Sequence, residues 1–188
     1  NFYLFKQGAG TSNIAEAGGF VRSTLAEDER PDVQFHFVPA QLDDHGRNRL
    51  PGFGYTLHAC FLRPKSRGRI SLNSADPNDK VRIESGYLSD AGNFDIKVMR
   101  EALQLSRRIL AQDAFSAYRG EEILPGSQVQ DDEAIDAFIR RKGESIYHPI
   151  GTCKMGSLDD AQTVVDSQCR VRGVSGLRVV DASVMPKL

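Results

Sequence analysis

Two stretches in which hydrophobic and polar residues alternate place the tightest limit on how this chain folds. In residues 32–38 and again in residues 55–62 every second side chain is apolar, and the side chains between them include His36 and His58. A period of two residues is that of a β-strand, whose successive side chains point to opposite faces. The two stretches therefore predict strands of a sheet with one face on the core. The other face, which carries the histidines, is expected to face a cavity or solvent.

Two further stretches have helical periodicity. Residues 93–110 carry an apolar stripe at helical spacing, made of Ile96, Met99, Leu103 and Leu110. Residues 131–142 begin with three acidic side chains and end with three basic ones, and Gly143 follows. Acids at the start, bases at the end and a glycine stop are typical of a helix. Its buried face is predicted to consist of Ile135, Phe138 and Ile139.

The fold class predicted from these elements is α+β, with a mainly antiparallel sheet and flanking helices, because strands and helices mix without a regular βαβ alternation. Shorter strands are expected at residues 69–72 and 81–83, on either side of a turn at residues 74–79 that holds the usual turn formers. The apolar run Leu177–Val180, preceded by a glycine, favours a buried strand near the end of the chain.

Composition excludes several classes of protein. With 40% hydrophobic and 26% charged residues the chain is too apolar to be disordered, and its net charge of -1 lacks the basic surplus of a nucleic-acid-binding protein. No apolar run is long enough to cross a bilayer. The three cysteines are odd in number and show no C-x-x-C spacing, which argues against a disulfide framework or a zinc site and favours a reducing, cytoplasmic location. The chain begins without Met, and both ends are interpreted as the interior of a longer protein.

His148 is the best single candidate for chemistry. It precedes Pro149 and lies near Gly151 and Gly156, so a rigid loop with room for a ligand surrounds it. A histidine can take a proton from a substrate hydroxyl and return it near neutral pH. Spacing alone favours a structural histidine, and the catalytic role is the alternative. A Cys/His hydrolase that uses Cys153 is a weaker interpretation, because a small packed cysteine explains that residue better.

Binding motifs for metals and dinucleotides are lacking. The remaining histidines do not show metal-ligand spacing, so no metal site is predicted. No G-x-G-x-x-G occurs, and a dinucleotide fingerprint, if the protein uses one, lies outside this sequence.

The segment His148–Gly156, which reads HPIGTCKMG, resembles the C-terminal motif of the glucose–methanol–choline (GMC) oxidoreductases. Further blocks of this family follow in the same order, and two precede it. These blocks are residues 16–20, 62–69, 164–166, 170–174 and 176–186. The resemblance covers nearly the whole chain, and within the family it is strongest to alcohol and choline dehydrogenases.

The resemblance implies an FAD-dependent alcohol oxidoreductase in which hydride moves from the alcohol to the flavin. His148 would be the base, Asp181 and Ala182 would lie against the flavin, and Glu16 and Tyr147 would lie near the substrate. The resemblance also implies part of a substrate-binding domain over residues 1–146, followed by the catalytic loop and a partial return to the FAD-binding domain over residues 147–188. In the family the C-terminal strand, here Leu177–Val180, joins the sheet of the FAD-binding domain, and without that sheet it is not expected to be buried in a single compact chain. The family's second catalytic residue would come just after the Met-Pro pair, beyond Leu188.

An acyclic primary alcohol, oxidised to an aldehyde, is the first choice of substrate, and choline is the second. Glu16 would pair with the quaternary ammonium of choline, and a surface acid is the alternative for it. A lyase on the same scaffold and a non-catalytic binding module are the competing classes. FAD is expected on the longer protein and not on this chain alone, which is expected to be inactive. The electron acceptor, membrane association of the longer protein and the oligomeric state stay open, and a homo-oligomer is compatible with the sequence.

Overall fold

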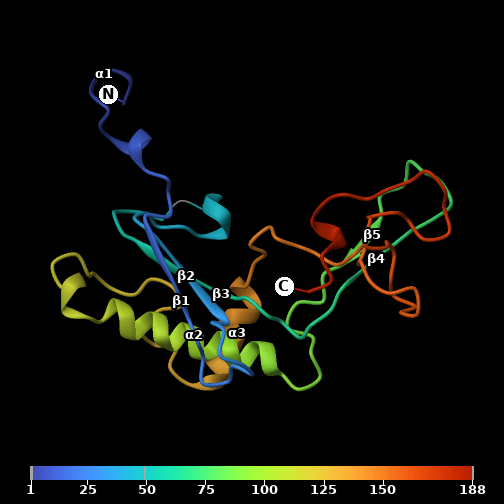
Figure 1. The fold of residues 1–188 in the computed structure, drawn as a ribbon. Coiled ribbons are helices and arrows are strands. Elements are labelled where there is room, and N and C mark those ends of the chain that lie inside the picture. The colour runs from blue at the N-terminus through green and yellow to red at the C-terminus, as the bar shows by residue number, and fades with distance from the viewer. Residues whose placement is uncertain (1, 49, 188) are drawn as a thin grey trace. The chain divides into compact units, whose positions relative to one another are not determined.

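The computed structural model describes residues 2–48 and 50–187, which form two compact units (Figure 1). Unit 1 consists of Asn1–Lys65 and Asp90–Glu144, and unit 2 consists of Ser66–Ser89 and Ser145–Leu188. The chain thus leaves unit 1 after Lys65 and returns to it at Asp90. The assignment of residues 1–146 to a substrate domain stays a prediction, and each unit is described by itself.

Unit 1 is built on a three-stranded antiparallel sheet in the order β1-β2-β3. The strands are β1 (Ala17–Val21), β2 (Val33–Val38) and β3 (Thr56–Phe61). The alternation in the sequence predicted β2 and β3, and the α+β class with antiparallel sheets and flanking helices is confirmed. β1 was not predicted as a strand, because its Gly18–Gly19 pair lacks the branched and aromatic side chains that favour strands.

The helices of unit 1 are two long ones and several short turns. The long ones are α2 (Phe94–Leu110) and α3 (Asp132–Lys142), and both were predicted to within a residue or two. The short ones are α1 (Phe2–Phe5), η1 (Ala9–Thr11), η2 (Asp44–Gly46) and η3 (Asp113–Phe115). The Asp131 side chain caps α3 by accepting a 2.8 Å hydrogen bond from Ala134 N, which satisfies a donor at the helix start.

The core of unit 1 lies between α2 and one face of the sheet. Val33 and Phe35 of β2 pack with Val98 and Ala102 of α2, and all four are buried. In the predicted helical stripe, Ile96 is buried, and Met99, Leu103 and Leu110 are half-buried. Phe94, Leu105 and Ile109 of α2 are partly buried against the same cluster. On α3, Ile135 and Ile139 are buried as predicted, and Phe138 is half-buried.

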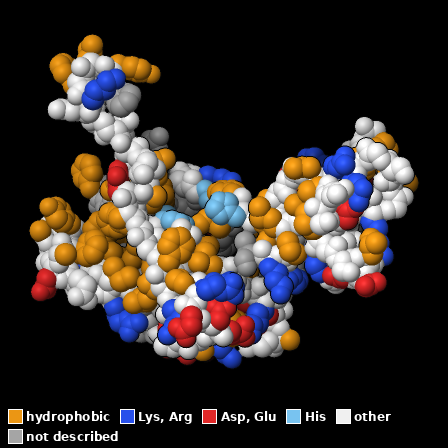
Figure 2. Space-filling view, viewed as in Figure 1, with side chains coloured by type: hydrophobic (Ala, Val, Ile, Leu, Met, Phe, Trp, Pro, Cys, Tyr) orange, Lys and Arg blue, Asp and Glu red, His pale blue; other side chains and the backbone are white. Residues whose placement is uncertain are grey.

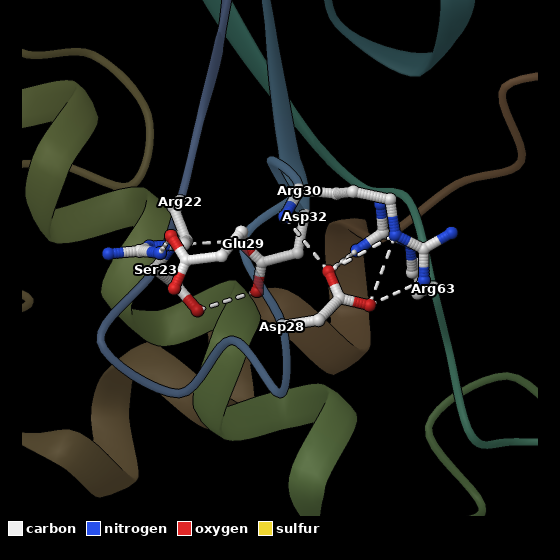
Figure 3. A network of polar contacts seen from close by, with 7 residues as sticks. All are labelled: Arg22, Ser23, Asp28, Glu29, Arg30, Asp32 and Arg63. Atoms are coloured by element: carbon white, nitrogen blue, oxygen red, sulfur yellow. Dashed lines mark hydrogen bonds and ion pairs between the residues drawn. The ribbon is translucent and has the colours of Figure 1, made fainter.

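Polar contacts fix the connection between β1 and β2 (Figure 3). The buried carboxylate of Asp32 accepts hydrogen bonds of 2.7 Å from Ser23 N and 2.6 Å from Ser23 Oγ, so its charge is not left unpaired. Asp28 forms ion pairs with Arg30 and Arg63. Hydrogen bonds from Arg30 hold the pKa of the Asp28 carboxyl well below its usual range. This turn is therefore a structural anchor and not a candidate reaction centre.

Unit 2 contains one short hairpin and irregular segments. β4 (Arg69–Ser71) pairs with β5 (Arg82–Glu84), and η4 (Ala182–Val184) lies near the chain end. The paired side chains Ile70 and Ile83 are 48% and 67% exposed, so this hairpin has no buried face. Val165 is fully buried and forms isolated bridges to Met155 and Val171.

The run Leu177–Val180 is not a buried strand within this chain, and its expected place in the sheet of the FAD-binding domain stays a prediction. The run is not assigned as a strand, Arg178 forms a single bridge to Arg170, and Leu177 and Val180 are 50% and 76% exposed. The run is apolar enough for burial, but two or more neighbouring strands are needed to bury it on both faces.

Candidate functional site

The loop that carries His148 lies in unit 2 and presents its first residues to solvent. His148 is exposed, and Tyr147 before it is 66% exposed with a positive φ of 64°. Tyr147 N donates a 2.9 Å hydrogen bond to Ser145 Oγ, which supports this local backbone. A bulky residue with a positive φ is uncommon and holds its backbone in a strained conformation. The imidazole is thus presented on a constrained loop and is accessible to a small molecule.

Backbone hydrogen bonds tie the same loop to the segment that contains Asp181 and Ala182. Cys153 N donates to Ser183 O at 3.0 Å, and Met155 N donates to Val184 O at 2.9 Å. A Cβ added to Gly151, whose φ is 87°, would lie 3.6 Å from Met185 O. Three of the predicted site residues, His148, Asp181 and Ala182, therefore lie on two segments that are joined side by side.

Asp181 is exposed, and its carboxylate is held in place. Its Oδ1 accepts a 2.8 Å hydrogen bond from Ser183 N, which caps η4. Hydrogen bonding with Ser183 lowers the pKa of Asp181, so the group is ionised at neutral pH. An ionised carboxylate accepts hydrogen bonds from hydroxyl groups such as those of a sugar-containing cofactor. Ala182 is exposed and carries only a methyl group, which permits close approach of a planar ring.

Glu16 belongs to unit 1, where it is exposed and directly precedes β1. Continuing the alternation of β1 by one step puts residue 16 in phase with Gly18. Of the predicted site residues, Glu16 belongs to unit 1, and Tyr147, His148, Asp181 and Ala182 belong to unit 2.

The sheet of unit 1 brings together a set of residues that the sequence alone did not join. Gly18, His36 and His58 lie opposite one another in register across β1, β2 and β3. His45 of η2 contacts Glu144, with 2.7 Å between Nε2 and Oε2. Partial desolvation, and then the proximity of His36 and His45, lower the pKa of His58. Figure 2 shows histidine side chains (pale blue) on the viewed face, above a cluster of charged side chains.

A pocket of unit 2 does not coincide with the predicted chemistry. It has a volume of about 400 Å³ and is lined by residues between Leu158 and Arg178, without His148 or Asp181. Two of its arginines donate to backbone carbonyls, Arg172 to Asp160 O and Arg178 to Gln168 O. These arginines thus organise the surrounding loops.

Across residues 2–48 and 50–187, no cluster of three or more His, Cys, Asp or Glu side chains has the arrangement of a metal site. Within the same residues, no helix has the length and apolar character that a membrane span requires.

A protein-family model and two curated relatives show which known proteins this chain is similar to. Residues 64–188 match the family model described as GMC oxidoreductase. The chain is 50% identical over 187 residues to an alcohol dehydrogenase (acceptor) of Pseudomonas putida, and this match covers 99% of the chain and 33% of that protein. It is 46% identical over 185 residues to an oxygen-dependent choline dehydrogenase of Brucella ovis, covering 98% of the chain and 33% of that protein.

Solved structures include similar folds. The crystal structure of pyridoxine 4-oxidase from Mesorbium loti superposes with a TM-score of 0.80 at 30% identity, over 93% of this chain and 34% of that chain. The chain thus spans about a third of the length of the curated relatives and of this structural neighbour.

Proposed function

The chain belongs to the GMC oxidoreductase family, and we propose that it forms the substrate-side part of an FAD-dependent oxidoreductase that converts an acyclic primary alcohol to an aldehyde. The observation that carries the proposal is the 50% identity to an alcohol dehydrogenase along 99% of the chain. The family match, residues 64–188, includes the whole His148 loop.

FAD is the cofactor that the family implies, and its solved neighbours include FAD-dependent oxidoreductases. The flavin supplies the hydride acceptor when it is bound. Asp181, an ionised acceptor, and Ala182, an exposed methyl residue, are the residues of this chain proposed to lie against it. The carboxylate of Asp181 can accept hydrogen bonds from the hydroxyl groups of the cofactor, and the small side chain of Ala182 leaves room for its planar ring.

His148 is proposed to accept the hydroxyl proton of the alcohol. The imidazole of His148 is exposed and is therefore available for this role. Its loop is held in place by backbone hydrogen bonds, from Cys153 N to Ser183 O and from Met155 N to Val184 O. Removal of the proton leaves an alkoxide, which releases hydride more readily than the neutral alcohol does. Tyr147, which directly precedes His148, is proposed to contact the substrate from the same loop.

The test of the proposed function is the visible spectrum of the flavin in a protein of the relatives' full length that carries this chain. We expect anaerobic addition of a primary alcohol to bleach the oxidised flavin stoichiometrically, because two electrons pass to it from each alcohol. A flavin that stays oxidised with every alcohol tried would overturn the proposal and favour a lyase on the same scaffold.

Choline is the second candidate substrate, favoured by the 46% identity to a choline dehydrogenase. Glu16, exposed at the start of β1, is proposed to attract the quaternary ammonium. Replacing Glu16 by Gln is then expected to raise KM for choline about tenfold while leaving KM for a neutral alcohol within about twofold. Steady-state kinetics with both substrates measure this, and unchanged choline kinetics would assign Glu16 to the surface.

A further inference from the structure

A pocket of unit 2 gathers more positive charge than its own lining neutralises. Its volume is about 400 Å³, and the charged side chains that line it are those of Arg170, Arg172, Arg178 and Asp166. Asp166 forms an ion pair with Arg170, with 2.8 Å between Oδ2 and Nε. The pocket, which we call the arginine pocket, therefore has an excess of two positive charges in its lining.

The backbone register brings two of these arginines close together. Arg170 and Arg178 are partners in an antiparallel bridge. Because Val171 N donates to Leu177 O at 3.0 Å beside them, they form a non-hydrogen-bonded pair, the arrangement in which opposite side chains lie closest. Arg172, two residues further along, lines the same pocket. Like charges directly opposite each other destabilise a strand pair, and a bound anion would relieve this repulsion.

The guanidinium groups of Arg172 and Arg178 keep most of their donors available. Each commits one of its five N–H groups to a loop carbonyl, Arg172 to Asp160 O at 3.1 Å and Arg178 to Gln168 O at 3.2 Å. In the part of the chain that the structure describes, neither guanidinium has a carboxylate oxygen within 4 Å. The Asp160 carboxylate interacts with Arg172 at longer range, but its direct ion pair is with Lys154, at 2.6 Å. The remaining N–H donors can therefore bind an anionic ligand.

The rest of the arginine pocket suits a ligand with an apolar part. Leu158, Val174 and Leu177 line it and are 65%, 52% and 50% exposed. The backbone N–H groups of Ser175 and Gly176, also in the lining, donate no hydrogen bond to any described residue, and such N–H groups in turns can bind anions. The volume falls within the range of small-molecule sites, about 300–1,000 Å³, so the pocket admits more than a single oxyanion.

We propose that the arginine pocket binds a phosphate monoester, with the phosphate between Arg172 and Arg178 and the organic group against the apolar side chains of the lining. A phosphate monoester carries close to two negative charges at neutral pH, which matches the excess charge of the pocket. Guanidinium groups bind phosphate oxygens through paired, charge-assisted hydrogen bonds. The lining includes neither His148 nor Asp181, so this binding goes beyond the proposed alcohol oxidation and does not depend on it.

The first test is isothermal titration calorimetry of the flavin-loaded, full-length enzyme, in which FAD already occupies its own site. Phenyl phosphate, a dianion with an apolar ring, is expected to bind at one site per chain with a Kd below about 1 mM. Methyl phenyl phosphate has the same ring but a single negative charge, and it should bind about tenfold more weakly. Inorganic phosphate lacks the ring and should bind about three- to tenfold more weakly.

These three titrations use the wild-type enzyme, so they need no variant to fold. Phenyl phosphate that does not bind at a saturable site would overturn the inference. Methyl phenyl phosphate that binds as tightly would overturn the role of the dianion, and inorganic phosphate that binds as tightly would overturn the role of the organic group.

Arg172→Gln and Arg178→Gln test the two arginines. Each removes one positive charge but keeps a side-chain amide that can donate to the loop carbonyl, and each is expected to weaken phenyl phosphate binding about tenfold. Arg108→Gln is the matched control, because Arg108 is exposed on α2 in unit 1 and does not line the pocket, so its Kd should stay within about twofold of wild type. The visible flavin spectrum should show wild-type FAD content in all three variants. Wild-type affinity in both pocket variants, or equal weakening by all three substitutions, would contradict the inference.

Discussion

Replacing His148 by Ala in the flavin-loaded, full-length enzyme is expected to slow anaerobic flavin reduction by alcohol about 10²- to 10⁴-fold. This range is the usual contribution of a positioned general base. The structure supports the choice of residue, because the imidazole is exposed and its loop is bonded to the segment of Asp181 and Ala182. Stopped-flow absorbance at the flavin band measures the rate directly.

Cys153→Ala is the control for this experiment. Cys153 follows in the same loop, is half-buried, and contributes its backbone N–H to Ser183 O, which the substitution retains. Its rate of flavin reduction should stay within about twofold of wild type, as for a residue away from reacting atoms. A His148→Ala enzyme that bleaches at the wild-type rate would remove His148 from the reaction, and a large loss in Cys153→Ala would revive the Cys/His interpretation.

The second large effect is expected from Gly18→Ala, which should lower the free energy of unfolding of the chain by about 1–3 kcal/mol through overpacking. The added Cβ would lie 2.5 Å from Phe35 O, a backbone atom that cannot turn away as a flexible side chain would. β1 must then shift away from β2 and lose ladder hydrogen bonds. Urea unfolding followed by circular dichroism measures the difference.

Gly19→Ala provides a control one residue away. A Cβ at Gly19 meets no described atom within 4 Å, so the same substitution adds no clash. Because glycine costs conformational entropy in a strand, this variant should match or exceed wild-type stability. Equal destabilisation by the two substitutions would show that the close approach at Gly18 does not limit the packing of β1.

Local periodicity accounts for the part of the fold that the sequence predicted. β2 and β3 show a period of two over most of their length, and α2 and α3 have clear helical spacing, so each could be placed from its own residues. β1 could not, because glycines carry no periodic signal and the strand exists through its pairing with β2. The run Leu177–Val180 has the local pattern of a strand, but its burial depends on neighbouring strands elsewhere, which its own residues do not specify.

The candidate site was predictable to a different extent. Resemblance of the His148 motif to a family, now confirmed, was far more specific than the spacing of one histidine. Alternation put His36 and His58 on the polar side of two strands, but their direct opposition depends on the strand register, which no sequence period fixes. The backbone hydrogen bonds from Cys153 N to Ser183 O and from Met155 N to Val184 O likewise join residues far apart in sequence. Local patterns could not predict them.

The division of unit 2 into two segments has a consequence for synthesis of the chain on the ribosome. The hairpin of β4 and β5 emerges first, and the 55 residues of segment 90–144 follow before any of residues 145–188 exist. At translation rates of about 5–20 residues per second, the hairpin waits roughly 3–11 s for the rest of its unit. Two strands alone are marginally stable, and the exposed Ile70–Ile83 pair is available to other chains during this interval. Unit 1 can therefore complete its fold while unit 2 is still unfinished.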